Sequence, residues 1–216
     1  MRNSGEKMII TLNQINEMEK LYRVKLINSL SGFKSANLIG TISKKGITNL
    51  ALFSSVIHVG ASPPLMGVLF RPLSTIRHTY DNIKETKHFT INHINKSIYQ
   101  SAHQTSARYD ENTSEFSACE LTEEYSQTIK APYVKESKIK IGLEYVEEQK
   151  IKANDTVFIV GEIIEVILPD DIIKPDGYID IESAGTLTIS SLDGYHETKL
   201  INRLSYAKTN KKLRIL

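Results

Sequence analysis

The start of one short predicted helix carries the side chains best suited to chemistry. Thr79 falls in the first turn of a helix predicted over residues 77–86, with Arg77 and His78 beside it and Asn82 one turn later. A helix start offers unpaired backbone N–H groups, and neighbouring hydroxyl, guanidinium and imidazole groups favour an anion such as a phosphate. The alternative is that His78 or Thr79 only caps a surface helix.

Two strands predicted before this helix supply further polar groups. Arg71 and Pro72 follow one of them, and Ser54 and Ser55 interrupt an otherwise apolar strand. Adjacent strand residues point to opposite faces, so only one serine can face inward. An inward hydroxyl without a partner costs about 1–3 kcal/mol. Its partner is therefore either a ligand or a neighbouring strand.

The order of these motifs resembles the flavin reductase-like family of FMN-binding split barrels. In that family a strand with Asn and paired Ser precedes a Ser-x-Pro-Pro-Leu strand and a basic-Thr-x-x-Asn-Ile helix. The matching residues here are Asn49 with Ser54-Ser55, Ser62-Pro63-Pro64-Leu65, and His78-Thr79-Tyr80-Asp81-Asn82-Ile83. The resemblance covers most of the chain, from Asn28 to Lys208.

The resemblance implies FMN as the cofactor and, because the family is usually dimeric, a homodimer. The cofactor-binding residues that it implies, together with the helix-start residues above, are Asn49, Ala51, Ser54, Ser55, Arg71, Pro72, Arg77, His78, Thr79 and Asn82. The implied activity is that of an oxidoreductase, in which NAD(P)H passes a hydride to the flavin and the flavin reduces another flavin or a further acceptor. Hydride transfer requires no general acid or base, so no catalytic residue is predicted.

The sequence contains no Gly-x-Gly-x-x-Gly, Gly-x-x-x-x-Gly-Lys or Gly-x-Ser-x-Gly motif. A Rossmann domain, a P-loop and an esterase elbow are therefore not expected. A nicotinamide would have to stack directly on the flavin. Tyr195 and His196 are the predicted substrate contacts, from a loop over the open face of the flavin. The alternative is a hairpin turn with Tyr195 packed on the surface.

Two other functions remain open. An FMN-binding electron carrier would pass electrons between proteins without using a nicotinamide. A cofactor-free β-barrel would act as a binding module, and the Arg71, Thr79 and Asn82 group would then only reflect helix capping. Nucleic acid is not an expected partner, because the net charge is only +2 and aromatic residues make up 7% of the chain.

Length and composition predict one domain over residues 8–216, after a flexible leader at residues 1–7. No run of eighteen apolar residues exists, so no membrane span is expected. The single cysteine, Cys119, is predicted to be a buried thiol and indicates a reducing, cytoplasmic location. The six histidines lack the spacing of zinc ligands, so no metal site is predicted.

Hydrophobic periodicity predicts an N-terminal helix or helix pair that packs on the barrel and ends at Gly32. A further helix is predicted over residues 95–103. The predicted strands are residues 36–42, 47–59, 65–71, 88–93, 139–145, 156–168 and 185–191.

The strand at residues 156–168 is nearly continuous in apolar, often β-branched residues, which indicates a central position. Many strands and few long helices predict a mainly β fold with helical additions (α+β), built as a closed antiparallel barrel of Greek-key type. The resemblance specifies the FMN-binding split barrel.

Overall fold

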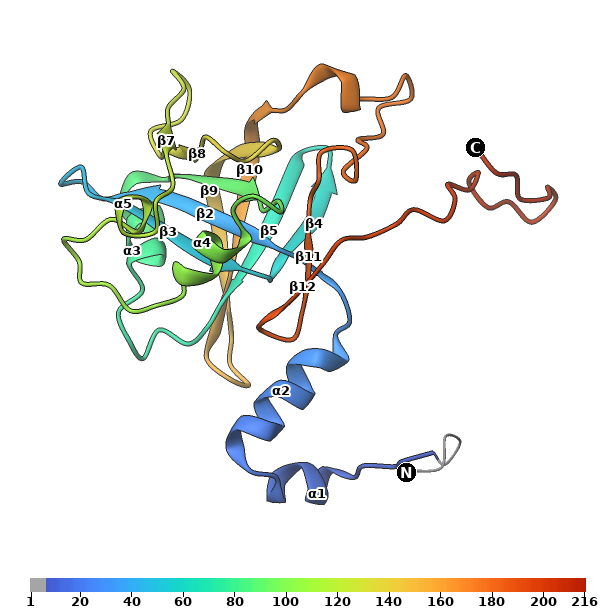
Figure 1. The fold of residues 1–216 in the computed structure, drawn as a ribbon, viewed down its shortest axis with the longest axis horizontal. Helices are drawn as coiled ribbons and strands as arrows, with labels where there is room; N and C mark the ends of the chain where they lie inside the picture. Colours follow the sequence, from blue (N-terminus) through green and yellow to red (C-terminus); the bar gives the residue numbers. More distant parts are fainter. Residues whose placement is uncertain (1–6) are drawn as a thin grey trace.

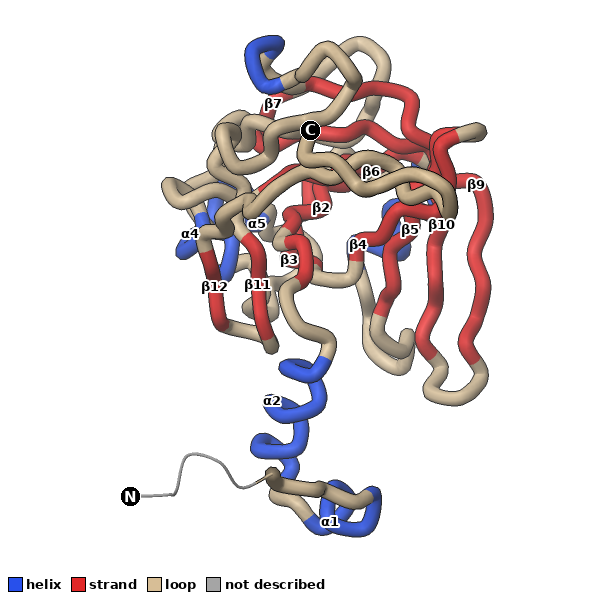
Figure 2. The backbone as a smooth tube through the Cα atoms, turned by 90° about the vertical axis from the view of Figure 1, so that its right-hand side faces the viewer, coloured by secondary structure: helices blue, strands red, loops and turns tan. Residues whose placement is uncertain are grey.

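A seven-stranded antiparallel sheet forms the centre of the computed structural model, which describes residues 7–216 (Figure 1). In spatial order its strands are β3 (Thr48–Phe53), β2 (Asn37–Ile42), β6 (His88–His93), β9 (Lys140–Ile151), β10 (Thr156–Ile167), β5 (Pro64–Phe70) and β4 (Val56–Ala61). The two terminal strands, β3 and β4, follow each other in the chain. The sheet therefore curls back on itself, as Figure 2 shows.

The barrel is split and not closed, which corrects the expectation of closure. Within the described residues no ladder joins β3 to β4, and only Ser54 and Ser55 link them. The mainly β fold with helical additions is confirmed. The prediction of a single strand over residues 47–59 is wrong, because the chain bends at these two serines and changes its pairing partner from β2 to β5.

Smaller elements surround this sheet. One group is a three-stranded sheet of β1 (Lys34–Ser35), β11 (Thr188–Ser190) and β12 (Gly194–His196). A second group is a two-stranded sheet of β7 (Glu123–Glu124) and β8 (Tyr133–Val134). The helices of the body are α3 (His78–Thr86), α4 (Tyr99–Gln104), α5 (Glu115–Ala118) and the 3-10 turn η1 (Asp170–Ile172).

Several local predictions are confirmed. Strands β2 and β3 form a hairpin whose turn contains Gly46 at φ +82, a conformation that glycine adopts without steric cost. Helix α3 matches the predicted helix closely, and β10 lies between β9 and β5 inside the sheet. Of the proline pair, Pro63 precedes β5 and Pro64 is its first residue.

The predicted helix at residues 95–103 begins four residues late, at Tyr99. The Asn95 side chain explains the delay. Its Oδ1 accepts hydrogen bonds from the backbone N of Ser97 at 3.0 Å and from the Ser97 hydroxyl at 2.6 Å. Such a local side-chain turn competes with the first turn of a helix.

Two clusters of buried side chains stabilise the body. One lies inside the curled sheet and includes Ile83 of α3 with Phe70 and Phe89. The other lies between the sheet and helices α4 and α5 and includes Phe116 and Cys119. The prediction that Cys119 is buried is confirmed, and burial raises the pKa of its thiol.

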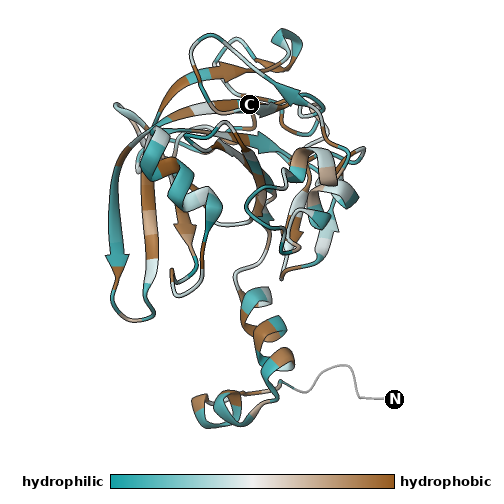
Figure 3. Ribbon diagram, turned by 90° about the vertical axis from the view of Figure 1, so that its left-hand side faces the viewer, coloured by the Kyte–Doolittle hydropathy of each residue, from teal (hydrophilic) through white to brown (hydrophobic). Residues whose placement is uncertain are grey.

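The N-terminal helices α1 (Leu12–Glu17) and α2 (Lys20–Leu30) do not pack on the barrel, contrary to expectation. Neither contains a buried residue, and Figure 3 shows them extending away from the sheet. The apolar residues of α2 lie on all sides of the helix, so no single face can bury them. The helix ends as predicted, with Gly32 at φ +71.

The predicted flexible leader at residues 1–7 lies outside the described residues except for the exposed Lys7. Within residues 7–216, no helix has the length and apolar content needed to cross a membrane.

A half-buried histidine predicts how stability depends on pH. Burial lowers the pKa of His93, whose Nδ1 lies 3.2 Å from Thr186 Oγ1, from 6.5 to about 4. Between these values the unfolded chain takes up a proton that the folded protein does not bind. The stabilising contribution of neutral His93 is therefore complete above pH 6.5 and is lost as the pH falls towards about 4.

We expect His93→Gln to flatten the decline in the free energy of unfolding over this pH range, measured by urea denaturation. Exposed His58 provides the control, and His58→Gln should retain the wild-type pH dependence. A His93→Gln curve parallel to that of wild type would contradict the assignment.

Candidate functional site

The side chain of Asn49 connects the start of α3 to the sheet. Its Oδ1 accepts a hydrogen bond from Thr79 Oγ1 at 2.7 Å. It also accepts a longer one, 3.4 Å, from Thr41 Oγ1 on β2. Asn82 continues the network by donating from Nδ2 to Thr41 Oγ1 at 3.1 Å. All four side chains are buried, so the first turns of α3 are fixed to two strands by polar contacts inside the protein.

Three of the predicted cofactor contacts, Asn49, Thr79 and Asn82, therefore lie together, and their side chains point inward. The single O–H of Thr79 is already donated to Asn49. In this arrangement Thr79 can offer a phosphate its backbone N–H, and not its hydroxyl proton.

A carboxylate that the sequence analysis missed completes the network. Glu115, the first residue of α5, is 5% exposed. Its Oε2 accepts hydrogen bonds from Asn49 Nδ2 at 2.7 Å and from the backbone N of Leu50 at 2.8 Å. No spacing motif links Glu115 to residues far earlier in the chain, so only the folded structure could reveal the contact.

The start of α3 carries free donors. In the described part of the chain, no acceptor is found for the backbone N–H groups of His78, Thr79 and Tyr80, and Arg77, the N-cap residue, provides no side-chain cap. The Nε of Arg77 is buried and also has no partner among residues 7–216. A helix start with unpaired N–H groups and an adjacent guanidinium attracts anions.

A hollow of about 330 Å³ opens at this helix start. It is lined by Leu73, Ser74, Thr75, Ile76, Arg77, Tyr80 and Asp81. The hollow therefore lies where the unpaired donors of α3 and Arg77 are found. The carboxylate of Asp81, which also lines the hollow, would repel an anion. The part of the hollow near Arg77 is therefore the more favourable place for an anion.

The other predicted cofactor contacts lie on β3, at the end of β5 and at the start of α3. Arg71 is exposed after the end of β5, Pro72 is half-buried beside it, and Ala51 is half-buried on β3. His78 is the first residue of α3 and is half-buried. These positions lie on the elements that flank Asn49 and Thr79.

Ser54 and Ser55 lie in the bend between β3 and β4 and not within one strand, so the alternating-face argument does not apply to them. The Ser55 hydroxyl donates to the backbone oxygen of Leu69 at 2.8 Å. This is the neighbouring-strand partner considered above. For Ser54 no hydrogen-bond partner is found within residues 7–216.

The two predicted substrate contacts, Tyr195 and His196, lie on β12, which forms a hairpin with β11. The Tyr195 hydroxyl lies 3.1 Å from His103 Nδ1, and burial raises the pKa of Tyr195 to about 12. His196 Nε2 lies 2.7 Å from Ser190 Oγ, and its ring packs against Phe33 at 4.8 Å.

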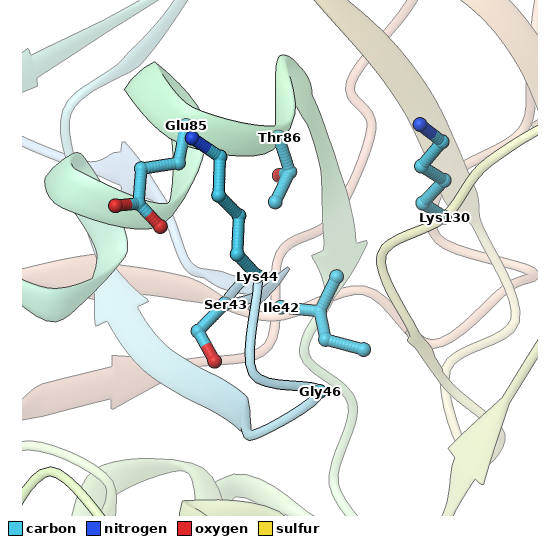
Figure 4. A pocket seen from close by; sticks show the side chains of 7 residues that line it. All are labelled: Ile42, Ser43, Lys44, Gly46, Glu85, Thr86 and Lys130. Carbon is cyan, nitrogen blue, oxygen red and sulfur yellow. The ribbon is translucent and has the colours of Figure 1, made fainter.

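A second hollow, of about 360 Å³, lies at the opposite end of α3 (Figure 4). It is lined by Ile42, Ser43, Lys44, Gly46, Glu85, Thr86 and Lys130. None of the predicted site residues lines it. The unpaired donors at the start of α3 therefore make the 330 Å³ hollow the better candidate site.

The curled antiparallel sheet with a split between its end strands defines the class of split-barrel proteins. The family model of the flavin reductase like domain matches residues 30–184, and the chain belongs to this family.

Solved structures agree with this assignment. A proposed flavin reductase with split barrel domain from Shewanella frigidimarina NCIMB 400 is 50% identical, and the match covers 93% of this chain and 100% of that chain with a TM-score of 0.90. Nitrilotriacetate monooxygenase component B from Bacillus cereus is 20% identical, with 92% and 100% covered and a TM-score of 0.80. Flavoredoxin of Desulfovibrio vulgaris is 22% identical, with 83% and 92% covered and a TM-score of 0.68. The last two similarities concern the fold alone.

The contact between Thr79 and Asn49 should contribute to stability. Thr79→Val keeps the shape of the side chain but removes its hydroxyl. Asn49 Oδ1 then retains only the longer hydrogen bond from Thr41. We expect a loss of about 1 kcal/mol in the free energy of unfolding by urea denaturation. Exposed Thr75 in the preceding loop is the matched control, and Thr75→Val should change stability little. Equal stability of both variants would show that the contact is not formed.

Proposed function

We propose that this protein is an FMN-binding oxidoreductase that takes electrons from NAD(P)H and passes them to a flavin or a protein acceptor. The observation that carries the proposal is the set of unpaired donors at the start of α3: free N–H groups and the buried Nε of Arg77 beside a 330 Å³ hollow. A phosphate dianion needs such donors, and FMN ends in one. Membership of the flavin reductase-like family supports the same interpretation.

The residues present fit the phosphorylated end of FMN. Backbone N–H groups at the start of α3 would bind the phosphate, with Arg77 and, from the end of β5, Arg71 supplying positive charge. Thr79 and Asn82 would act by holding α3 in place. The resemblance places Asn49, Ala51, Ser54 and Ser55 beside the ribityl chain and the ring, which would require the bend between β3 and β4 to face the cofactor.

Bound FMN would supply the redox chemistry by accepting a hydride from the nicotinamide and releasing electrons to the acceptor. The chain's own residues would bind and orient the reactants. Tyr195 and His196 are proposed to contact the nicotinamide or the acceptor. Both side chains already have partners on α4 or β11, so this role would require His103 or Ser190 to release them.

An electron carrier is the second candidate function. It is favoured by the shared fold of flavoredoxin from Desulfovibrio vulgaris. Such a carrier would bind the same cofactor through the same donors but would not react with a nicotinamide. For either function we propose a cytoplasmic location, on the basis of the single free thiol of Cys119.

Binding of FMN and riboflavin tests the phosphate site. We expect Arg77→Gln to weaken FMN binding about tenfold, the effect of losing one charge-assisted hydrogen bond, and to leave riboflavin binding unchanged. Fluorescence titration measures both dissociation constants. Arg108→Gln is the control, because Arg108 is exposed and forms no ion pair within residues 7–216. A wild-type protein that binds FMN no better than riboflavin would refute the phosphate site.

Rapid mixing of the FMN-loaded protein with NADH or NADPH separates the two functions. Bleaching of the flavin absorbance within seconds is the expected result for a reductase. Bleaching by dithionite but by neither nicotinamide would instead identify a carrier.

We also propose a homodimer, held partly by the N-terminal arm (α1 and α2) and the C-terminal tail (residues 198–216). The chain exposes 14210 Å² of surface. A compact monomer of its mass would expose about 10,000 Å². The excess, about 4,000 Å² for each chain, is more than enough to supply the roughly 2,000–5,000 Å² that the two partners of an obligate dimer bury in total. Figure 1 shows the arm and the tail leaving the body in different directions.

The apolar side chains of the arm should carry part of this association. Leu21 and Leu30 of α2 are 69% and 71% exposed in the single chain. We expect light scattering to give twice the 24.4 kDa monomer mass for wild type and a shift towards monomer for Leu21→Lys with Leu30→Lys. Ile173→Lys, at a residue 48% exposed on the body, is the control. A monomeric wild-type protein would contradict the proposal.

A further inference from the structure

The burial of the Glu115 carboxylate costs free energy, and its hydrogen-bond partners do not lie on its own helix, α5. A carboxylate removed from water destabilises a protein unless hydrogen bonds compensate it. Its two hydrogen-bond donors both come from β3: the side chain of Asn49 and the backbone of Leu50. The compensating hydrogen bonds therefore come from one strand, and the effect of the carboxylate on β3 defines its role.

The first effect of Glu115 is to cover the edge of the sheet. β3 is terminal among the strands of residues 7–216, so none of these strands lies beyond it to accept the N–H of Leu50. The 2.8 Å bond from this N–H to Glu115 Oε2 takes the place of a ladder bond. This fixes the backbone of β3 next to Asn49.

The second effect is to set the orientation of the Asn49 amide. A carboxylate only accepts hydrogen bonds, so Nδ2 of Asn49 must face Glu115. Oδ1 must then face Thr79, which donates to it at 2.7 Å. A flipped amide would place an oxygen against the carboxylate, and the Thr79 hydroxyl would have to turn and accept a hydrogen bond instead of donating one. Glu115 thus selects the orientation in which Thr79 donates to Asn49.

We propose that Glu115 is a positioning residue for the phosphate end of the flavin: through Asn49 and Thr79 it holds the start of α3, where the free N–H groups and Arg77 lie. This inference rests on the proposed function. Glu115 does not touch the cofactor in this scheme. It determines where the donors lie, so it affects the binding of a ligand that has a phosphate and not of one that lacks it.

Removal of the carboxylate provides the test. Glu115→Leu removes the acceptor of both Asn49 Nδ2 and the Leu50 N–H, so the orientation of the Asn49 amide is no longer imposed. Glu115→Gln is the conservative variant. The Leu50 N–H can only donate, so it holds the new amide oxygen in the place of Oε2, where this oxygen still accepts from Asn49.

The dissociation constants of FMN and riboflavin are measured for wild type, Glu115→Leu and Glu115→Gln. We expect FMN binding to weaken about tenfold in Glu115→Leu and to stay within about threefold of wild type in Glu115→Gln. Riboflavin binding should stay within about twofold of wild type in every variant, because riboflavin has no phosphate to contact the start of α3. Exposed Glu111 supplies the control, and Glu111→Gln should bind both ligands as wild type does.

Loss of FMN and riboflavin binding in parallel would show a merely structural role and overturn the inference. So would a Glu115→Leu variant that binds FMN as wild type does. If Glu115→Leu does not fold, Thr79→Val, which breaks the next contact of the same network, decides instead, because an unchanged ratio of FMN to riboflavin affinity in this variant overturns the inference. A wild-type protein that does not bind FMN would refute the proposed function itself, whereas FMN binding with unchanged ratios in the variants refutes only the role of Glu115.

Discussion

Buried polar groups must be paired, and around Asn49 this requirement connects elements that the sheet alone would leave separate. The amide of Asn49 has a carboxylate on one side and two hydroxyls on the other, contributed by α5, α3 and β2. Each contact is short-range and directional, so the helix start cannot move without leaving a buried donor or acceptor unpaired. The fold therefore places α3 by hydrogen bonding as well as by the packing of Ile83.

The two ends of the sheet differ in how they are covered. At β3 the edge is closed by a side chain, Glu115, and by helices that pack against the strand. At β4 the outer residues Ile57 and Val59 are 53% and 42% exposed. Uncovered apolar edge strands invite pairing with other chains. The two edges of the sheet therefore differ in how far a further strand could pair with them.

Much of the fold followed from local patterns, because alternation, a glycine turn and a helix start are encoded within a few residues. The hairpin around Gly46 and helix α3 are examples. The split at Ser54 and Ser55 could not be predicted from the same patterns, since a bend within an apolar run appears only when the strand changes its neighbour. The unpacked N-terminal helices were missed for another reason: helical periodicity shows that a helix forms, not that a partner surface exists in the same chain.

For the candidate site, the clustering of Asn49, Thr79 and Asn82 was predictable from the order of motifs. The direction of their side chains was not, because it depends on Glu115 and Thr41, which no motif identifies. From the sequence alone, a hydroxyl at a helix start is interpreted as a free donor, because its acceptor is not known. The Nε of Arg77 has no partner within residues 7–216, and only the structure could reveal this, because it shows that the atom is buried.

The bond between Glu115 and Leu50 spans 65 positions of the chain. Contacts between distant residues form after local ones during folding, because the intervening loop must first be ordered. The hairpin of β2 and β3 can therefore form early, while the last bond that orients Asn49 awaits the docking of α5. The final geometry at the start of α3 is in this way tied to the last steps of folding, and a nascent chain whose synthesis has not passed α5 would have the strands around Asn49 but not the bond that orients this side chain.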